Sequence, residues 1–392
     1  MLNVTRLLVG TPAAGDSIRY GERPAGPDGI RALHPHDRPV VVWNITRRCN
    51  LACAHCYSAS TSRPAPDELT TQEARAVLED LAEFRVPVVL LSGGEPLLRP
   101  DVVELVAQAC SLGVQPVLST NGTLLTDEMI DRLRQAGLRR IGISLDGLAE
   151  THDRVRGVAG AFEGTTTGLE RSIAAGFRVS LRLTMARYNA DQLEEIFGLA
   201  VRAGVQRLCI YHLAYAGRGR ALLPFDLGHD ERRAAVASVF RRTVEVAARG
   251  YDLEVLTVDN HADGAYLLLW AAEHAPQRVE EARRLLSANG GNSSGLGIAC
   301  IDERGRVHPD QFWRTKTVGD VRRRPFSAIW QDGSHALLDR LRARRSLLPD
   351  ECRACRFLPV CNGNLRVRAE AASGDPWGMD PACYLTAAER AA

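Results

Sequence analysis

Short apolar runs rich in β-branched residues alternate with longer amphipathic stretches between residues 40 and 212. The runs are typical of buried strands, and the stretches between them are typical of helices that pack over a parallel sheet. Repetition of this pair of elements predicts an α/β fold, as an open parallel sheet or a partial barrel. The six expected strands are Val40–Ile45, Pro87–Ser92, Gln115–Ser119, Arg140–Leu145, Arg178–Thr184 and Arg207–His212.

The helices between these strands have clear start and stop signals. Thr70-Thr-Gln-Glu73 has the order of a capping box and opens an expected helix. Gly113, Gly137, Gly176 and Gly204 each follow a helical stretch and precede a strand, as helix-ending glycines do. Ligands gather at the carboxyl ends of parallel strands, so polar residues directly after the strands are candidate site residues.

The pattern changes at about Phe225, where arginine- and alanine-rich helix begins. A short strand-like segment at Asp252–Val258 and a polar loop at Ser287–Gly295 follow, and half of the 10 cysteines lie from Cys300 onward. We therefore divide the chain into an N-terminal segment (1–38), a barrel core (39–225), a helical connecting region (226–299) and a C-terminal cysteine-bearing module (300–392).

The bulk composition excludes several classes of protein. With 45% hydrophobic and 24% charged residues, a chain of 392 residues can bury a sizeable core. A net charge of +2, from 49 basic and 47 acidic residues, gives no case for nucleic acid as the main partner. The start lacks an apolar signal segment and the chain lacks a long uncharged apolar run, so we expect a cytoplasmic protein with reduced thiols and no membrane partner.

Three cysteines with the spacing C-x3-C-x2-C follow the first expected strand, namely Cys49, Cys53 and Cys56. A cubane [4Fe–4S] cluster is normally closed by four thiolates, so three leave one iron free to bind a small molecule. A zinc site is the alternative, although zinc usually pairs C-x2-C with a second pair or with histidines. His55 lies between two of the thiols and is poorly placed to complete such a site.

This spacing resembles that of the radical S-adenosylmethionine (SAM) enzymes, and the resemblance covers nearly the whole chain. Ser92-Gly-Gly-Glu-Pro96, after the second expected strand, matches the GGEP motif of that family completely. The resemblance implies a partial (β/α)6 barrel, a SAM-binding [4Fe–4S] cluster, SAM itself and an external electron donor such as ferredoxin or flavodoxin.

The same resemblance implies a set of SAM-binding residues at successive strand ends. Each segment taken singly also reads as an ordinary turn, because Asn-Gly and Asp-Gly are common turn pairs. Their order behind the three cysteines favours the SAM site. The expected residues are Gly93, Gly94 and Glu95 for the methionine end, Asn121, Ser144, Asp146 and Arg182 for ribose and carboxylate contacts, and His55 or Tyr57 for stacking near adenine.

Four further cysteines near the end of the chain predict a second metal site, namely Cys352, Cys355, Cys361 and Cys383. They suffice for another [4Fe–4S] cluster and resemble the auxiliary-cluster extension called SPASM, in its one-cluster or twitch-like form. A full extension has further cysteines where this chain has Asp310 and Leu365, so we expect one auxiliary cluster. A zinc knot is the alternative for these thiols. Cys300 has a weaker claim as a ligand, and Cys110 and Cys209 read as buried apolar residues.

Within the family, the chain most resembles the radical SAM enzymes that act on siroheme-derived tetrapyrroles. The segments concerned include Tyr211–Gly219, Asn260–Gly264, Val307–Trp313 and Cys361–Glu370. The resemblance implies removal of acetate carboxyl groups from 12,18-didecarboxysiroheme to give Fe-coproporphyrin III, as in the alternative heme pathway. A heme d1 step at the propionates, a peptide maturase and a non-catalytic iron–sulfur carrier are the alternatives. We expect a maturase to have an N-terminal recognition domain, and a carrier needs no Gly-Gly-Glu motif.

An iron tetrapyrrole with several carboxylates needs a flat apolar slot with a cationic rim. His212, His261 and His308 are candidate axial ligands or proton donors, each with a structural role as the alternative. The expected walls are Tyr211, Tyr215, Phe312 and Trp313, and the expected carboxylate partners are Arg218, Arg220, Arg366 and Arg368.

Overall fold

The fold was analysed in a computed structural model of the chain that describes residues 1–21 and 38–391. Most of the proposed N-terminal segment, residues 22–37, lies outside the described residues. The strands are β1 (Leu2–Asn3), β2 (Val40–Thr46), β3 (Val89–Gly93), β4 (Pro116–Thr120), β5 (Arg140–Ser144), β6 (Arg178–Met185), β7 (Arg207–His212), β8 (Glu254–Val258), β9 (Ile298–Ile301), β10 (Arg306–His308) and β11 (Gly319–Asp320).

Helices separate most of these strands. They are α1 (Asp16–Tyr20), α2 (Thr71–Glu83), α3 (Val102–Ser111), α4 (Asp127–Gln135), α5 (Ala149–Arg156), α6 (Ala161–Ala174), α7 (Leu193–Arg202), α8 (His229–Ala248), α9 (Ala262–His274), α10 (Val279–Asn289), α11 (Phe326–Trp330), α12 (Ala336–Arg342), α13 (Asp350–Arg353), α14 (Leu358–Cys361), α15 (Arg366–Ser373) and α16 (Ala387–Ala391). A 3-10 segment, η4 (Gly217–Phe225), follows β7.

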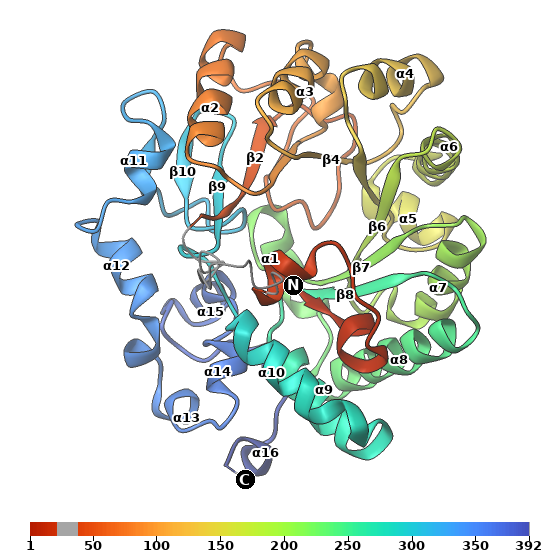
Figure 1. The fold of residues 1–392 in the computed structure, drawn as a ribbon, viewed down its shortest axis with the longest axis vertical. Coiled ribbons are helices and arrows are strands. Elements are labelled where there is room, and N and C mark those ends of the chain that lie inside the picture. Colours follow the sequence, from red (N-terminus) through yellow and green to blue (C-terminus); the bar gives the residue numbers. More distant parts are fainter. Residues whose placement is uncertain (22–37, 392) are drawn as a thin grey trace, which may run out of the picture.

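One sheet runs through the described residues in the order β1-β8-β7-β6-β5-β4-β3-β2-β9-β10-β11. Strands β2 to β7 are parallel neighbours in sequence order, which confirms the six predicted βα strands. Seen as in Figure 1, the strands surround a centre and α2, α3, α4, α6, α7 and α8 lie outside them. The result is a partial barrel with its helices on the outer face.

The sheet extends beyond the six predicted strands at both edges. The strand-like segment at Asp252–Val258 becomes β8, which pairs in parallel with β7. On the other side β9 pairs in parallel with β2, and β10 and β11 continue the sheet as antiparallel neighbours. The sheet therefore runs across the domain boundaries proposed at 225 and 299.

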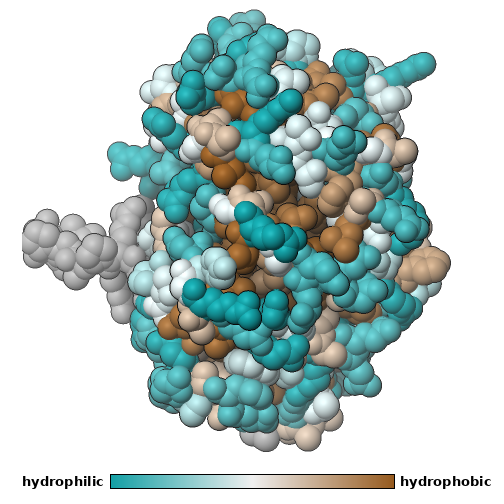
Figure 2. Space-filling view, turned by 90° about the vertical axis from the view of Figure 1, so that its right-hand side faces the viewer, coloured by the Kyte–Doolittle hydropathy of each residue, from teal (hydrophilic) through white to brown (hydrophobic). Residues whose placement is uncertain are grey.

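Local signals place the helices as the sequence predicts. At the start of α2 the Thr70 side chain accepts a hydrogen bond from the Glu73 backbone, and the Glu73 carboxylate accepts one from the Thr70 backbone. Glycines with left-handed φ angles follow α3 and α7, with φ of +76° at Gly113 and +72° at Gly204. Hydrophilic side chains cover most of the face in Figure 2, with apolar atoms visible in a hollow near its middle.

The C-terminal residues pack against the barrel. Helix α11 contacts α2, and α14 contacts α9 and α10. Among the described residues, no helix combines the length and apolar character needed to span a membrane.

Candidate active site

The loop after β2 holds the first three cysteines at the carboxyl ends of the barrel strands. Cys49 and Cys53 are buried and, with Cys56, pack in one small cluster with Leu51 and Ala161. The backbone N–H of Cys49 donates to the Thr61 carbonyl at 2.7 Å. The three predicted ligands are thus brought together by one loop.

The end of β3 supports this loop through backbone contacts. The Gly94 N–H donates to the Thr46 carbonyl at 2.8 Å, and the Glu95 N–H donates to the Arg48 carbonyl at 2.7 Å. A side chain at Gly93 would collide with the Thr46 carbonyl oxygen, and Gly93 also has a φ of +139°. The two glycines are therefore needed to seat the cysteine loop on β3.

Glu95 connects the ends of β3 and β4. Its fully buried carboxylate accepts hydrogen bonds from the Thr120 hydroxyl and the Asn121 N–H, both at 2.8 Å, and from the Leu97 N–H at 3.1 Å. Burial raises the pKa of Glu95 to about 7, and these three hydrogen bonds oppose the rise. Its carboxylate thus faces protein groups. Asn121 also bonds the loop residue Asn50, through its side-chain amide at 2.9 Å.

A buried charge network lies beside the cysteine loop. The Asp146 carboxylate is 2.6 Å from an Arg156 guanidinium nitrogen and 3.1 Å from His55 Nε2. Burial alone would raise the pKa of Asp146, but Arg156 and His55 hold it well below its usual range. Arg156 also donates to Cys53 Sγ at 3.5 Å. The carboxylate therefore fixes the Arg156 guanidinium and the His55 ring next to one of the predicted cluster ligands.

A cavity opens at the carboxyl ends of β3 to β7. Its lining includes several predicted site residues. The barrel core contributes His55, Tyr57, Gly93, Ser144, Asp146, Arg182, Tyr211 and His212, and the C-terminal module contributes Phe312. Gly94, Glu95 and Asn121 are not among the lining residues and support the loops behind it. Tyr57 donates to the Asn44 side chain at 2.9 Å, and its ring meets Phe312 edge-on at 5.4 Å.

The donor chemistry of the cavity fits SAM and a cluster. On the residues that line this cavity, three buried nitrogen atoms have no hydrogen-bond partner among the described residues, namely His55 Nδ1, Arg156 Nε and Arg182 Nε. A bound molecule with carboxylate and hydroxyl groups would satisfy such atoms. The Cys56 sulfur shares hydrogen bonds with the hydroxyls of Ser58 and Ser60. Although burial opposes them, these bonds lower the pKa of the thiol, which favours a thiolate ligand.

Sequence reasoning missed Arg156, Asn44 and the two serines beside Cys56. Arg156 stands in the last turn of α5, where basic residues are common for reasons of the helix dipole alone. No local pattern marks it as a site residue, because its role depends on how α5 packs against the cysteine loop.

Comparison with known proteins agrees with this geometry. Residues 43–200 match the Radical SAM superfamily. Fe-coproporphyrin III synthase of Methanosarcina barkeri is 46% identical, over 99% of this chain and 98% of its own length. The chain belongs to the radical SAM family. Pre-heme d1 synthase of Dinoroseobacter shibae is 45% identical, over 90% of this chain and 87% of its own length.

The fold of this radical SAM protein also matches a solved structure. Streptococcus suis SuiB bound to its precursor peptide SuiA superposes with a TM-score of 0.69 at 17% identity, covering 89% of this chain and 76% of SuiB. This likeness confirms the predicted barrel with a C-terminal module.

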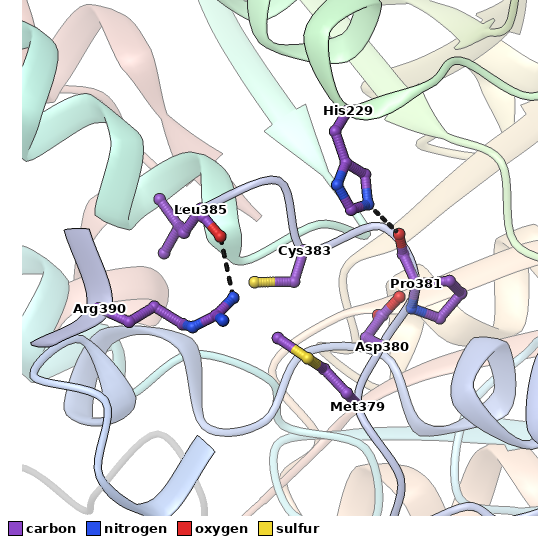
Figure 3. Close-up of a pocket in the computed structure, with 7 residues that line it drawn as sticks. All are labelled: His229, Met379, Asp380, Pro381, Cys383, Leu385 and Arg390. Atoms are coloured by element: carbon purple, nitrogen blue, oxygen red, sulfur yellow. Dashed lines mark hydrogen bonds between the residues drawn. The ribbon is translucent and has the colours of Figure 1, made fainter. Parts of the chain in front are cut away.

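The radical SAM protein brings its four C-terminal cysteines into one neighbourhood. Burial, opposed by Arg366 and reinforced by the nearby thiols of Cys383 and Cys355, raises the pKa of the Cys352 thiol to about 11. Burial also raises the pKa of the Cys361 thiol, and the nearby thiols of Cys383 and Cys352 act in the same direction. Figure 3 shows the Cys383 sulfur directed into a cavity that Met379 and Arg390 also line. Among the described residues, no group of three or more histidine, cysteine or carboxylate side chains is arranged to hold a metal ion.

Several substrate residues expected from the sequence lie outside the cavity, because they are engaged in the protein interior. His308 is fully buried, with Nδ1 at 2.9 Å from the Lys316 carbonyl and Nε2 at 3.2 Å from Asp302. His261 is buried and does not line the cavity, and burial holds its pKa well below the usual value. Trp313 donates to Glu370 at 2.7 Å, and Tyr215 donates to Asp226 at 2.8 Å.

The expected arginine rim is wrong for two of its four members, Arg366 and Arg368. Arg368 is fully buried and paired with Asp380 at 2.8 Å, and buried Arg366 donates to backbone carbonyls such as that of Gly378. Arg218 donates to the Cys53 and Ser60 carbonyls at 2.8 and 2.6 Å, so it supports the cysteine loop. Only Arg220 of this set is exposed.

Proposed function

We propose that this radical SAM enzyme modifies side chains of a siroheme-derived iron tetrapyrrole. The specific reaction proposed is removal of acetate carboxyl groups from 12,18-didecarboxysiroheme to give Fe-coproporphyrin III. One observation carries the proposal: the match to Fe-coproporphyrin III synthase extends over 99% of this chain. The cavity supports it, because Tyr211 and Phe312 offer aromatic surface from the barrel and from the C-terminal module.

A second candidate is a heme d1 step at the propionate side chains. It is favoured by the match to pre-heme d1 synthase, at 45% identity over 90% of this chain. Both candidates use the same cofactors and the same class of substrate, and they differ in the side chain attacked.

The cofactor residues proposed from the sequence divide into two groups. Cys49, Cys53 and Cys56 would hold the SAM-binding [4Fe–4S] cluster, and Arg182, Ser144 and His55 would meet SAM in the cavity. When bound, cluster and SAM supply a 5′-deoxyadenosyl radical for hydrogen abstraction.

The chain's own part is positioning and exclusion of water. Asp146 fixes His55 and Arg156 beside Cys53, and Glu95 ties the loops of β3 and β4 together. Arg182 donates to Ser119 at 2.6 Å, which leaves its Nε for an anionic group in the cavity.

We further propose that Cys352, Cys355, Cys361 and Cys383 hold one auxiliary [4Fe–4S] cluster. Cys383 and Cys355 act on the pKa of Cys352, and Cys383 and Cys352 act on that of Cys361, which supports a shared site. Ferredoxin or flavodoxin would supply electrons, and such thiolate sites suit the reducing cytoplasm.

The test is anaerobic incubation of the reconstituted enzyme with didecarboxysiroheme, SAM and a reductant, read by mass spectrometry. Loss of acetate carboxyl mass supports the proposed reaction. Change at the propionates supports the heme d1 candidate. If the tetrapyrrole neither binds nor changes while a peptide is modified, a peptide maturase takes its place.

A further inference from the structure

Three buried side chains form a hydrogen-bonded chain that ends at the active-site cavity. His212, at the end of β7, lies with Nε2 at 2.8 Å from Asp263 Oδ2 on α9. The hydroxyl of Tyr384 donates to the other oxygen of Asp263, also at 2.8 Å. His212, Asp263 and Tyr384 are 3%, 0% and 3% exposed, so each has a fixed orientation in the interior.

This arrangement determines which ring nitrogen of His212 is free. A buried carboxylate at Nε2 favours the proton on that nitrogen, which leaves a lone pair on Nδ1. Among the described residues Nδ1 makes no hydrogen bond, and His212 lines the cavity. Histidines that bind metals commonly donate their other N–H to a carboxylate, as His212 does here.

Other side chains in the cavity are less suited to bind a metal of the substrate. The Tyr57 hydroxyl donates to Asn44, and burial raises the pKa of Tyr211 above its usual value, so Tyr211 stays a neutral phenol. His55 shares the arrangement of His212, with Asp146 at Nε2 and no partner at Nδ1, but it stands between Cys53 and Cys56, where it is assigned to SAM. Of the three candidate histidines, only His212 lines the cavity; His261 and His308 are buried elsewhere in the described residues.

We propose that Nδ1 of His212 binds the central iron of the tetrapyrrole substrate as an axial ligand. The inference rests on the proposed function and deepens it, because it assigns the group that positions the macrocycle. Ligation by neutral imidazole displaces a weak ligand such as water from the iron and transfers no electron. Asp263 and Tyr384 are then positioning residues that hold the imidazole ring.

The chain of bonds also joins the ligand to the C-terminal module. Tyr384 directly follows Cys383, one of the proposed auxiliary-cluster cysteines. The position of Cys383 thereby bears on the position of His212, through Tyr384 and Asp263. This gives the module a part in placing the substrate iron.

The test uses the anaerobically reconstituted holoenzyme with Fe(III)-coproporphyrin III as the probe. The wild type should give the electron paramagnetic resonance spectrum of histidine-ligated iron and, after reduction, an iron–histidine band in resonance Raman spectra. His212→Ala should lose both signatures, and added imidazole should restore them. Asp263→Asn should keep the ligand but shift the Raman band, with about 10–100-fold weaker probe binding. His274→Gln, at an exposed histidine stacked on Trp270, is the matched control and should resemble the wild type.

The inference is overturned if His212→Ala keeps the wild-type spectra, or if the wild type binds the probe without a histidine signature or does not bind it. Should His212→Ala fail to fold, judged by circular dichroism and iron content, the Asp263→Asn band decides: an unshifted band contradicts the inference. Turnover of didecarboxysiroheme by the same wild-type preparation separates the two claims. Histidine ligation without turnover contradicts the proposed function alone. Turnover together with unchanged His212→Ala spectra contradicts the inference alone.

Discussion

Glu95 shows how a single buried residue links the cofactor loops to the stability of the barrel. Its pKa is raised to about 7 by burial, from an ordinary value of 4.5. Between these two pH values the folded state keeps a proton that the unfolded chain releases, so the folded state loses stability as the pH rises. The loss is complete above pH 7 and amounts to about 3 kcal/mol at most.

Glu95→Gln should remove this pH dependence, since the amide does not titrate. We expect the melting temperature of the wild type to fall relative to that of the variant between pH 5 and pH 8. Differential scanning calorimetry of both proteins from pH 5 to pH 8 measures this difference in melting temperature. Parallel curves for the two proteins would show that Glu95 ionises normally.

For single residues, the sequence predicts which chemistry a side chain can offer better than it predicts where that side chain lies in the fold. The cysteine spacing and the Gly-Gly-Glu motif led directly to residues around the cavity, with Gly93 in its lining and Glu95 behind it. The sequence predicts Arg366 and Arg368 as substrate cations, but both are buried against the chain's own carbonyls and Asp380. Sequence periodicity does not distinguish an arginine at a cavity rim from one folded into the interior, because that depends on packing between distant segments.

Among the elements, the junction of β2, the cysteine loop and β3 is where the cofactor loop is fixed. Gly93→Ala adds a methyl group against the Thr46 carbonyl, so the loop with the three cysteines must shift. We expect this variant to lose about four irons per chain on reconstitution, and with them SAM cleavage. Iron analysis and 5′-deoxyadenosine formation measure the two effects.

Gly113→Ala is the matched control for that variant. Gly113 also has a positive φ, of +76°, but no atom lies within 4 Å of the position of its Cβ. It should lose some stability from backbone strain and keep its iron. Equal loss of iron in both variants would show that general destabilisation, and not the collision at Gly93, is responsible.

The elements themselves were predicted well where the signal is local. All six βα strands occur within two residues of their predicted bounds, and the capping box at Thr70 forms as expected. The addition of β8 and β9 to the sheet was not predicted. Their membership depends on pairing with β7 and β2, which lie far away in sequence, and no local pattern encodes that pairing.

At the scale of the whole molecule, the proposed auxiliary cluster puts two iron–sulfur sites in one chain. The reconstituted wild type should contain about eight irons per chain, and a variant with alanine at Cys352, Cys355, Cys361 and Cys383 should retain about four. Mössbauer spectroscopy with metal analysis makes the measurement. Tightly bound zinc with a single cluster would instead support a zinc knot in the C-terminal module.

In the proposed function, the three-cysteine loop supports SAM cleavage for reaction with a tetrapyrrole. The most direct measurement is 5′-deoxyadenosine formed under dithionite, with and without didecarboxysiroheme, by the wild type and by a variant with alanine at Cys49, Cys53 and Cys56. We expect the wild type to cleave SAM and to form modified tetrapyrrole together with 5′-deoxyadenosine, and the variant to form neither. Persistent SAM cleavage by the variant would contradict this expectation.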